Sequence, residues 1–315
     1  MSTVPSLSPI NVAAVLKAAG DPMRLDILKI MRRDSFGVLE LCQIFGIQQP
    51  SMSHHLKVMT KAGLLISRRE GNSIFYRRVQ NAQAQVQDIL NQVYSISDAS
   101  ISESTLFDRV EEIQQERKKK SEEFFRENVD QFRAQQDLIA SFSDYGETVQ
   151  DLLNTDSSNI WLEVGAGQGD LLESTQPLFK KTIALDISQD LIEFSQKRLK
   201  GAEIEFFLGE TSDAVERGIM ADCISCNMVL HHVPSPANVV ADMANMLNPG
   251  GQLLICDLDE HDQEWAQSSC GDLWLGFSAE EISQWALDAH LVEGREQFLV
   301  LRNGFRIQIR EFIKE

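Results

Sequence analysis

The sequence predicts a mixed fold, in which a mainly α winged helix-turn-helix domain precedes an α/β Rossmann-like domain. Two segments carry this prediction. LELCQIFGIQQPSMSHHLKVMTKAGLL has the pattern of two helices joined by a tight turn. Further along, NIWLEVGAGQGDLLE has the pattern of an apolar strand that enters a glycine-rich loop and then a helix. We expect residues 1–95 to form the first domain, 96–123 a helical linker and 124–315 the second domain.

In the first domain, the spacing of Leu39, Leu41 and Ile44 is helical and ends at Gly46. Pro50 then starts a second helix at a position where a missing amide proton costs little. The outward face of this second helix carries hydrogen-bonding groups and a cation, namely Gln49, Ser51, Ser53, His54 and Lys57. Such side chains suit base edges and phosphates in a major groove. The alternative is that the two helices are only a packing unit.

A basic hairpin is expected after the second helix. Strands at 65–69 and 73–78 flank Glu70-Gly71-Asn72, whose residues tolerate the positive φ of a tight turn. Four arginines make this wing cationic: Arg68, Arg69, Arg77 and Arg78. Residues 1–80 hold 11 Lys and Arg against 5 Asp and Glu, although the whole chain carries a net charge of −18. This asymmetry is typical of a basic nucleic-acid reader attached to an acidic body.

Residues 10–95 resemble the winged-helix repressors of the ArsR/SmtB family in the segments DPMRLDIL, QPSMSHHLKVMTKAGLL and RREGNSIFYRR. The resemblance implies a homodimeric repressor that binds double-stranded operator DNA, with Arg68 and Arg69 added to the DNA-binding residues of the second helix. The family's metal-sensing thiolate pair is incomplete, because Ile44 stands where a partner of Cys42 would be. The predicted helix 79–94 also has no His or Cys, so we expect no metal.

One apolar stripe is a candidate dimer surface. Val86, Ile89, Leu90 and Val93 recur at helical spacing in a Gln-rich segment. Together with the apolar helix 12–19, the stripe resembles the dimer interface of these repressors. The alternative is that it packs on its own domain.

Residues 95–120 are expected to connect the domains without contributing to a core. Their Lys run fits a solvated helix face, since acidic residues lie one turn away. In the helix that follows, four side chains would form an apolar face against the second domain: Phe124, Phe125, Phe132 and Leu138.

In the second domain, polar and glycine residues follow successive apolar strands. Glu163 precedes the glycine loop, where a carboxylate would repel a pyrophosphate but not the ammonium or sulfonium of S-adenosylmethionine. Asp186 ends the next strand, suitably placed to accept two ribose hydroxyls. The third and fourth strand ends offer further candidates, namely Gly209, Glu210, Thr211, Asn227 and Met228. The alternative is a tight strand-to-helix turn that binds nothing.

Residues from about 124 to 315 resemble a class I S-adenosylmethionine-dependent methyltransferase. The resemblance implies that Glu163 and Gly165 hold the methionine moiety and that Asp186 binds ribose. It also implies that Glu210, Thr211 and Met228 frame adenine. The expected cofactor site, for S-adenosylmethionine or S-adenosylhomocysteine, is completed by Ala166, Gly167, Gly169, Ile187, Gly209 and Asn227.

The sequence nominates no catalytic residue. His231 and His232 follow the fourth strand and could supply a base, although a structural role is the preferred interpretation. Cys223 and Cys226 would point to opposite faces of a strand, which disfavours metal binding. An acidic cluster after the fifth strand is expected to be a solvated rim: Asp257, Asp259, Glu260, His261 and Asp262.

Composition fits a cytoplasmic protein, because the five cysteines are scattered and no signal segment or membrane-length apolar run is evident. The preferred hypothesis is a ligand-controlled repressor whose methyltransferase-like domain senses the nucleoside. By resemblance it would respond to S-adenosylhomocysteine and control methionine-cycle genes. The alternative is an active small-molecule methyltransferase with an autoregulatory winged-helix module.

Overall fold

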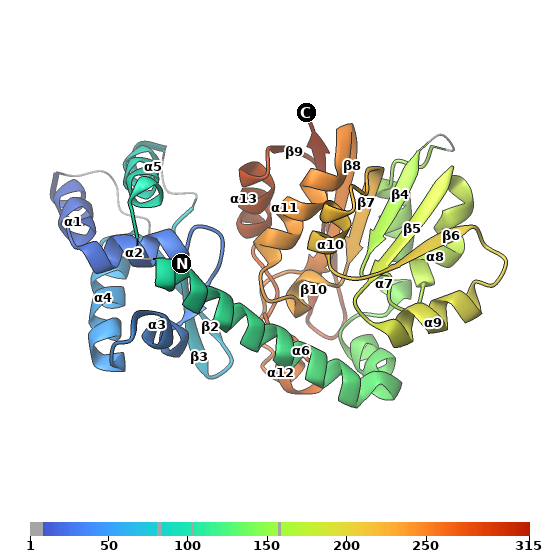
Figure 1. Cartoon of the computed structure of the whole chain (residues 1–315), viewed down its shortest axis with the longest axis horizontal. Helices are drawn as coiled ribbons and strands as arrows, with labels where there is room; N and C mark the ends of the chain where they lie inside the picture. The colour runs from blue at the N-terminus through green and yellow to red at the C-terminus, as the bar shows by residue number, and fades with distance from the viewer. Residues whose placement is uncertain (1–8, 81–83, 103, 157–158) are drawn as a thin grey trace. The chain divides into compact units, whose positions relative to one another are not determined.

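The computed structural model describes residues 9–80, 84–102, 104–156 and 159–315 (Figure 1). The chain divides into two compact units, Met1–Lys120 (unit 1) and Ser121–Glu315 (unit 2). Among the described residues, no helix is long and apolar enough to cross a bilayer.

Unit 1 is a helical domain with a small three-stranded sheet in the order β1-β3-β2. Its elements are α1 (Pro9–Ala19), α2 (Pro22–Ile30), β1 (Phe36–Gly37), α3 (Val38–Phe45), α4 (Gln49–Lys61), β2 (Leu65–Glu70), β3 (Ser73–Arg78), α5 (Ala84–Ala99) and the first part of α6 (Ser104–Ile139). The predicted helix-turn-helix is α3 and α4, and the predicted wing is the antiparallel β2–β3 hairpin.

Local sequence explains where these elements end. Gly46 adopts a left-handed φ of 64° and ends α3, while Pro50 lies in the first turn of α4. Gly63, with φ 78°, follows the end of α4, and Gly71, with φ 57°, makes the hairpin turn. The wing and α4, which is the predicted recognition helix, therefore follow from turn chemistry that the sequence shows.

The core of unit 1 contains most of the apolar residues that set the helical spacing of α3 and α4. Leu41 and Ile44 are fully buried, as are Met52, Leu56, Met59 and Leu64 of the α4 region. Leu39, which shares the helical spacing of α3, is 65% exposed and lies outside this core. It lies at the start of α3, where a helical spacing alone does not say how far the core extends.

The apolar stripe of α5 packs within unit 1. Leu90 and Val93 are buried, and Val86 and Ile89 pack against the same core. The alternative considered from sequence, that the stripe serves its own domain, therefore holds for these side chains. The described helix also begins at Ala84, later than the expected start at Val79.

The beginning of α6 belongs to the core of unit 1, contrary to the expectation that residues 95–120 contribute no core. Leu106 and Ile113 are buried in it. Arg117 is also buried, with its Nε donating to Glu40 Oε1 at 2.8 Å and Nη2 donating to the Ser35 carbonyl at 2.9 Å. Arg117, which stands beside a run of lysines, thus makes a structural contact. Its acidic partner lies far away in the sequence, so the local charge pattern does not reveal the pair.

Unit 2 is a seven-stranded sheet in the order β6-β5-β4-β7-β8-β10-β9, with helices on both faces (Figure 1). Its strands are β4 (Ile160–Val164), β5 (Lys181–Asp186), β6 (Ile204–Leu208), β7 (Ala221–Asn227), β8 (Leu247–Leu258), β9 (Leu291–Val300) and β10 (Arg306–Lys314). Its helices are the rest of α6, α7 (Phe142–Leu152), α8 (Asp170–Thr175), η1 (Gln176–Leu178), α9 (Gln189–Arg198), α10 (Thr211–Glu216), η2 (Leu230–His232), α11 (Pro236–Met246), α12 (Trp265–Cys270) and α13 (Ala279–Asp288).

The strand order fixes where a ligand can bind. Strands β4 to β8 are parallel, and β9 and β10 form the expected antiparallel hairpin at one side. The chain runs outward from β4 through β5 to β6 and then returns to β7 on the other side of β4. In such sheets the crevice at the carboxyl ends of the strands flanking the reversal is the usual ligand site.

The apolar face expected on the helix after residue 120 is only partly present. Leu138 is 58% exposed, so it does not brace unit 2. Phe124 lies against Gly271, where an added Cβ would come within 2.2 Å of its ring. The side chains of Phe125 and Phe132 lie outside the described part of the structure.

Candidate functional site

The glycine loop lies at the carboxyl end of β4. Gly165, Gly167 and Gly169 have φ values of 70°, 54° and 80°, which L side chains rarely adopt. The Gly165 amide donates to the Leu185 carbonyl at 2.8 Å, so the loop is tied to the neighbouring strand β5. The loop therefore turns sharply at three residues that carry no side chain of their own.

Gly165 offers a test of this geometry. An added Cβ would lie 2.3 Å from Val229 Cγ2, whereas Gly218 has a similar φ of 68° and open space around it. We expect Gly165→Ala to lower the free energy of unfolding by roughly 2–4 kcal/mol, because backbone strain and overpacking add. The matched control Gly218→Ala carries only the strain of about 1–2 kcal/mol. Equal urea midpoints for the two variants would contradict the close packing at Gly165.

Glu163 is a buried carboxylate held at the start of the loop. It is 3% exposed, and it accepts hydrogen bonds from the Asn227 side-chain amide at 2.8 Å and from the Ser225 hydroxyl. Ser225 in turn accepts from Trp161 Nε1 at 2.7 Å. Burial raises the pKa of Glu163 to about 8, although the two hydrogen bonds oppose the rise. The group is therefore mostly protonated at neutral pH until a cation approaches.

This titration predicts how a cationic ligand responds to pH. An ammonium beside Glu163 favours the carboxylate, so binding must release a proton below a pH of about 8. The dissociation constant of S-adenosylhomocysteine should fall as pH rises toward that value, by at most about tenfold per pH unit. Calorimetry in buffers of different ionisation enthalpy measures the released proton. Glu163→Gln, or methylthioadenosine, which lacks the ammonium, should abolish the slope; a slope that persists in Glu163→Gln would refute the assignment.

Asp186 ties together the ends of three strands. Its Oδ2 accepts from the Gly167 amide at 2.8 Å and its Oδ1 from the Ser188 amide at 2.9 Å. Its carbonyl accepts from the Gly209 amide at 3.0 Å. Burial raises the pKa of Asp186, against the effect of the backbone hydrogen bonds. The next side chain, Ile187, is 51% exposed and so is free to cover an apolar ligand ring.

The remaining predicted cofactor residues lie at the same edge of the sheet, since they follow the parallel strands β4, β6 and β7. Asn227 Oδ1 is buried and has no hydrogen-bond partner in the described structure. Met228 has a positive φ of 55°, which is uncommon for a side-chain-bearing residue. The Thr211 hydroxyl already donates to Asp242 Oδ2 at 2.7 Å, so that group is committed to the fold.

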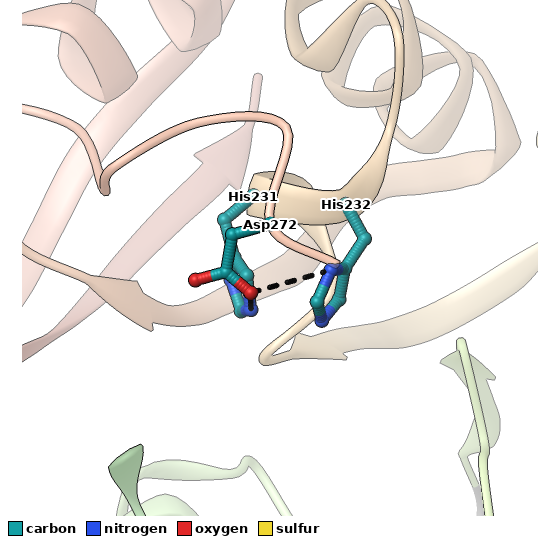
Figure 2. Close-up of side chains that lie close together, drawn as sticks. All are labelled: His231, His232 and Asp272. Atoms are coloured by element: carbon teal, nitrogen blue, oxygen red, sulfur yellow. Dashed lines mark ion pairs between the residues drawn. The ribbon is translucent and has the colours of Figure 1, made fainter. Parts of the chain in front are cut away.

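Beyond β7, two histidines and two aspartates form a buried cluster, of which Figure 2 shows His231, His232 and Asp272. His231 Nδ1 lies 2.6 Å from Asp257 Oδ1, and His232 Nδ1 lies 3.7 Å from Asp272 Oδ1. His232 Nε2 contacts the Gln136 side-chain amide at 2.9 Å. Sequence reasoning missed Asp272 and Gln136, because no local pattern connects them to the histidines.

The acidic rim expected after β8 is only partly solvated. Asp257 is fully buried, and Asp259 is 7% exposed and pairs with Arg306. That part of the expectation is wrong, because β8 extends through Leu258 and so places Asp257 in the interior, and Asp259 directly after it forms a bridge with Phe277. Glu260 and Asp262 are exposed, as predicted.

The cysteines offer no thiolate cluster among the described residues. All five are free thiols, and Cys223 and Cys226 are both buried within β7. Burial raises the pKa of Cys223 to about 12, and that of Cys226 rises as well. Such thiols are protonated packing groups and poor metal ligands.

In unit 1, α4 presents a polar surface. The five predicted side chains are exposed, namely Gln49, Ser51, Ser53, His54 and Lys57. The opposite face of the helix buries Met52, Leu56 and Met59. This division leaves the polar face free to enter a groove.

The wing is less cationic than the sequence indicates. Arg78 is buried, where its Nε donates to the Leu28 carbonyl at 2.8 Å and its guanidinium pairs with Asp98. Arg68 pairs with the buried Glu70. Arg69 remains exposed, with its Nε donating to the Gly71 carbonyl at 2.8 Å. Arg69 therefore lies at the surface of the wing, whereas Arg78 is a structural residue.

Comparison with known proteins supports both sequence resemblances. A family described as "Methyltransferase domain" matches residues 105–292, and one described as "Bacterial regulatory protein, arsR family" matches residues 21–67. The HTH-type transcriptional regulator NmtR of Mycobacterium tuberculosis is 35% identical over 83 residues, which are 26% of this chain and 69% of that protein.

The second unit is similar to methyltransferases. The ubiquinone biosynthesis O-methyltransferase of Xanthomonas axonopodis pv. citri is 28% identical over 113 residues, which are 35% of this chain and 47% of that protein. The chain thus spans about half the length of the curated methyltransferases it matches. The solved N-methyltransferase NodS of Bradyrhizobium japonicum, in complex with S-adenosyl-L-homocysteine, has a TM-score of 0.45 and 16% identity, covering 58% of this chain and 97% of that one.

Proposed function

This chain belongs to the methyltransferase-domain family and carries an arsR-family regulatory domain, and we propose that it is a ligand-controlled transcriptional repressor. In this proposal a homodimer binds operator DNA in the cytoplasm, and unit 2 binds S-adenosylhomocysteine or S-adenosylmethionine as effector. The genes it controls would be those of the methionine cycle. The observation that carries the proposal is the presence, in one chain, of an exposed polar recognition helix and a complete glycine loop.

The chemistry of the loop supports the choice of effector. Glu163 is a buried carboxyl group that a ligand ammonium would convert to the charged form. Asp186 is placed beside Gly167 at the end of the next strand, where a carboxylate can accept ribose hydroxyls. A nucleoside that carries an amino-acid chain matches both groups, whereas the pyrophosphate of a dinucleotide would be repelled by the Glu163 carboxylate.

Dimerisation remains a proposal that rests on exposed rather than buried apolar residues. Since the α5 stripe packs internally, the surface left for a second copy is formed by other side chains of α1 and α5. Leu16 is 56% exposed and Ile96 is 62% exposed. Burying the exposed part of two such side chains in an interface is favourable by roughly 1–2 kcal/mol each.

A working small-molecule methyltransferase is the second candidate. It is favoured by the glycine loop and the strand-end residues, which are as complete as an enzyme would need, and methyl transfer depends largely on positioning. No residue is assigned as its catalytic base.

Two measurements on the purified full chain separate the candidates. Mass spectrometry after denaturation identifies any co-purified nucleoside, and we expect one of the two adenosyl compounds. Incubation with methyl-labelled S-adenosylmethionine and a small-molecule extract should yield no labelled product if the unit is a sensor. Repeated turnover would instead support the enzyme.

A further inference from the structure

The buried cluster beyond β7 contains a compact set of donor atoms. His231 and His232 lie on η2, and Asp272 lies in the loop after α12 (Figure 2). One ligand atom from each lies within 4.8 Å of the others. Asp272 Oδ1 is 3.9 Å from His231 Nε2 and 3.7 Å from His232 Nδ1. All three residues belong to unit 2.

Three atoms of this cluster are buried without a hydrogen bond in the described structure. His231 Nε2 and both Asp272 carboxylate oxygens have no hydrogen-bond partner in the described structure. Their residues are 0% and 4% exposed, so bulk water does not satisfy them. Leaving a buried polar group unsatisfied costs about 1–3 kcal/mol. The separations of 3.7 and 3.9 Å are also too long for direct hydrogen bonds between the imidazoles and the carboxylate.

Neighbouring groups orient the imidazoles toward Asp272. The 2.6 Å contact with Asp257 places the proton of His231 on Nδ1, which leaves the Nε2 lone pair facing the cluster. Asp257 is itself held by the amides of Leu230 at 2.8 Å and Leu258 at 2.7 Å. A carboxylate that fixes a histidine in this way is the usual outer partner of a metal-bound imidazole. Gln136 contacts the far nitrogen of His232, and Nδ1 of His232 lies on the side of Asp272, where it also has a weak 3.4 Å contact with the Gly271 carbonyl that a bound metal ion would replace.

We propose that His231, His232 and Asp272 bind one divalent transition-metal ion such as Zn²⁺ or Fe²⁺. Two imidazoles and one carboxylate are donors that these ions accept, while Mg²⁺ and Ca²⁺ prefer oxygen ligands. Bond lengths of about 2.0–2.2 Å to a tetrahedral ion put ligand atoms roughly 3.3–3.5 Å apart. The two carboxylate–imidazole separations of 3.7 and 3.9 Å need to contract by a few tenths of an ångström to reach that spacing, and the imidazole–imidazole separation, which is within 4.8 Å, by at most about 1.5 Å. Three protein ligands leave a further coordination position open.

The cluster also has a defined place in the fold. The cluster follows β7 and uses Asp257 of β8, so it lies at the carboxyl-end edge of the sheet that also carries the glycine loop. The site shares no residue with the positions considered for metal sensing in unit 1. The inference therefore does not depend on the proposed regulatory function.

Cobalt titration of the untagged full chain, stripped with a chelator, tests the site. The wild type should bind one Co²⁺ per chain, with visible d–d absorption that Zn²⁺ displaces. Asp272→Asn should weaken Co²⁺ binding at least a hundredfold, because a charged ligand is lost. Asp257→Asn keeps all three ligands and should weaken binding about 10- to 100-fold. The exposed His290, which has a positive φ of 61°, supplies the control His290→Asn, which should bind as the wild type does.

A wild type that binds no Co²⁺, or an Asp272→Asn variant that binds it equally well, would overturn the proposal. Circular dichroism shows whether each variant folds. If the variants do not fold, X-ray absorption spectroscopy of the wild-type zinc complex identifies the metal ligands instead. Two imidazoles without sulfur are expected, and thiolate ligation or fewer imidazoles would rule the site out.

Discussion

Asp186→Ala is expected to weaken S-adenosylhomocysteine binding by about 1–3 kcal/mol or more, which corresponds to a factor of roughly 5 to 150 or more. Two effects combine in this variant. The ligand loses charged hydrogen bonds to its ribose, and the Gly167 amide loses the carboxylate that accepts from it at 2.8 Å. Isothermal titration calorimetry measures the change directly.

Asp190→Ala is the matched control. Asp190 is an exposed aspartate in the first turn of α9, four positions along the chain from Asp186. Its removal should change ligand affinity by less than about 0.5 kcal/mol, as is usual for surface substitutions. If both variants bind like the wild type, the ribose is not held at Asp186.

His54→Ala is expected to lower specific operator affinity by about 1–3 kcal/mol, because an exposed recognition-helix side chain that reads a base edge contributes on that scale. Binding to unrelated duplex DNA should hardly change, which gives an internal control.

Arg69→Ala should instead weaken binding to operator and to unrelated DNA alike, and it should lower the slope of log affinity against log salt concentration by about 1. Fluorescence anisotropy at several salt concentrations separates the two effects. A footprint without a protected palindrome would contradict the dimeric DNA-binding mode.

Elements whose signals are local could be predicted from the sequence. Gly46 and Pro50 mark the turn between α3 and α4 by backbone chemistry alone, and the strand before Gly165 is apolar except for Glu163. The polar face of α4 follows from the same periodicity. These features depend on residues within a few positions of one another.

Features that depend on distant partners could not be predicted. The α5 stripe shows which face is apolar, but periodicity does not say whether that face meets its own domain or a second copy. Arg78 and Arg117 look like solvated cations until the fold brings Asp98 and Glu40 to them. The same holds for the candidate metal site, since Asp272 reaches the two histidines only through tertiary structure.

The helix α6 offers a physical route for coupling. Its early residues Leu106 and Ile113 are buried in unit 1, while the hydroxyl of Ser121 donates to the His232 carbonyl in unit 2 at 3.1 Å. Replacing residues 118–120 with three glycines would loosen this helix, since glycine costs about 1 kcal/mol per helical position. Both ligands should still bind, but each should lose its effect on the other.

The central claim is that the two units are energetically coupled, and operator affinity with and without saturating S-adenosylhomocysteine tests it most directly. A sensor requires the nucleoside to change operator affinity by a factor that typically corresponds to about 1–3 kcal/mol. Linkage then requires saturating operator to change nucleoside affinity by the same factor. Gel-shift titrations that give the same operator affinity in both conditions would contradict the account.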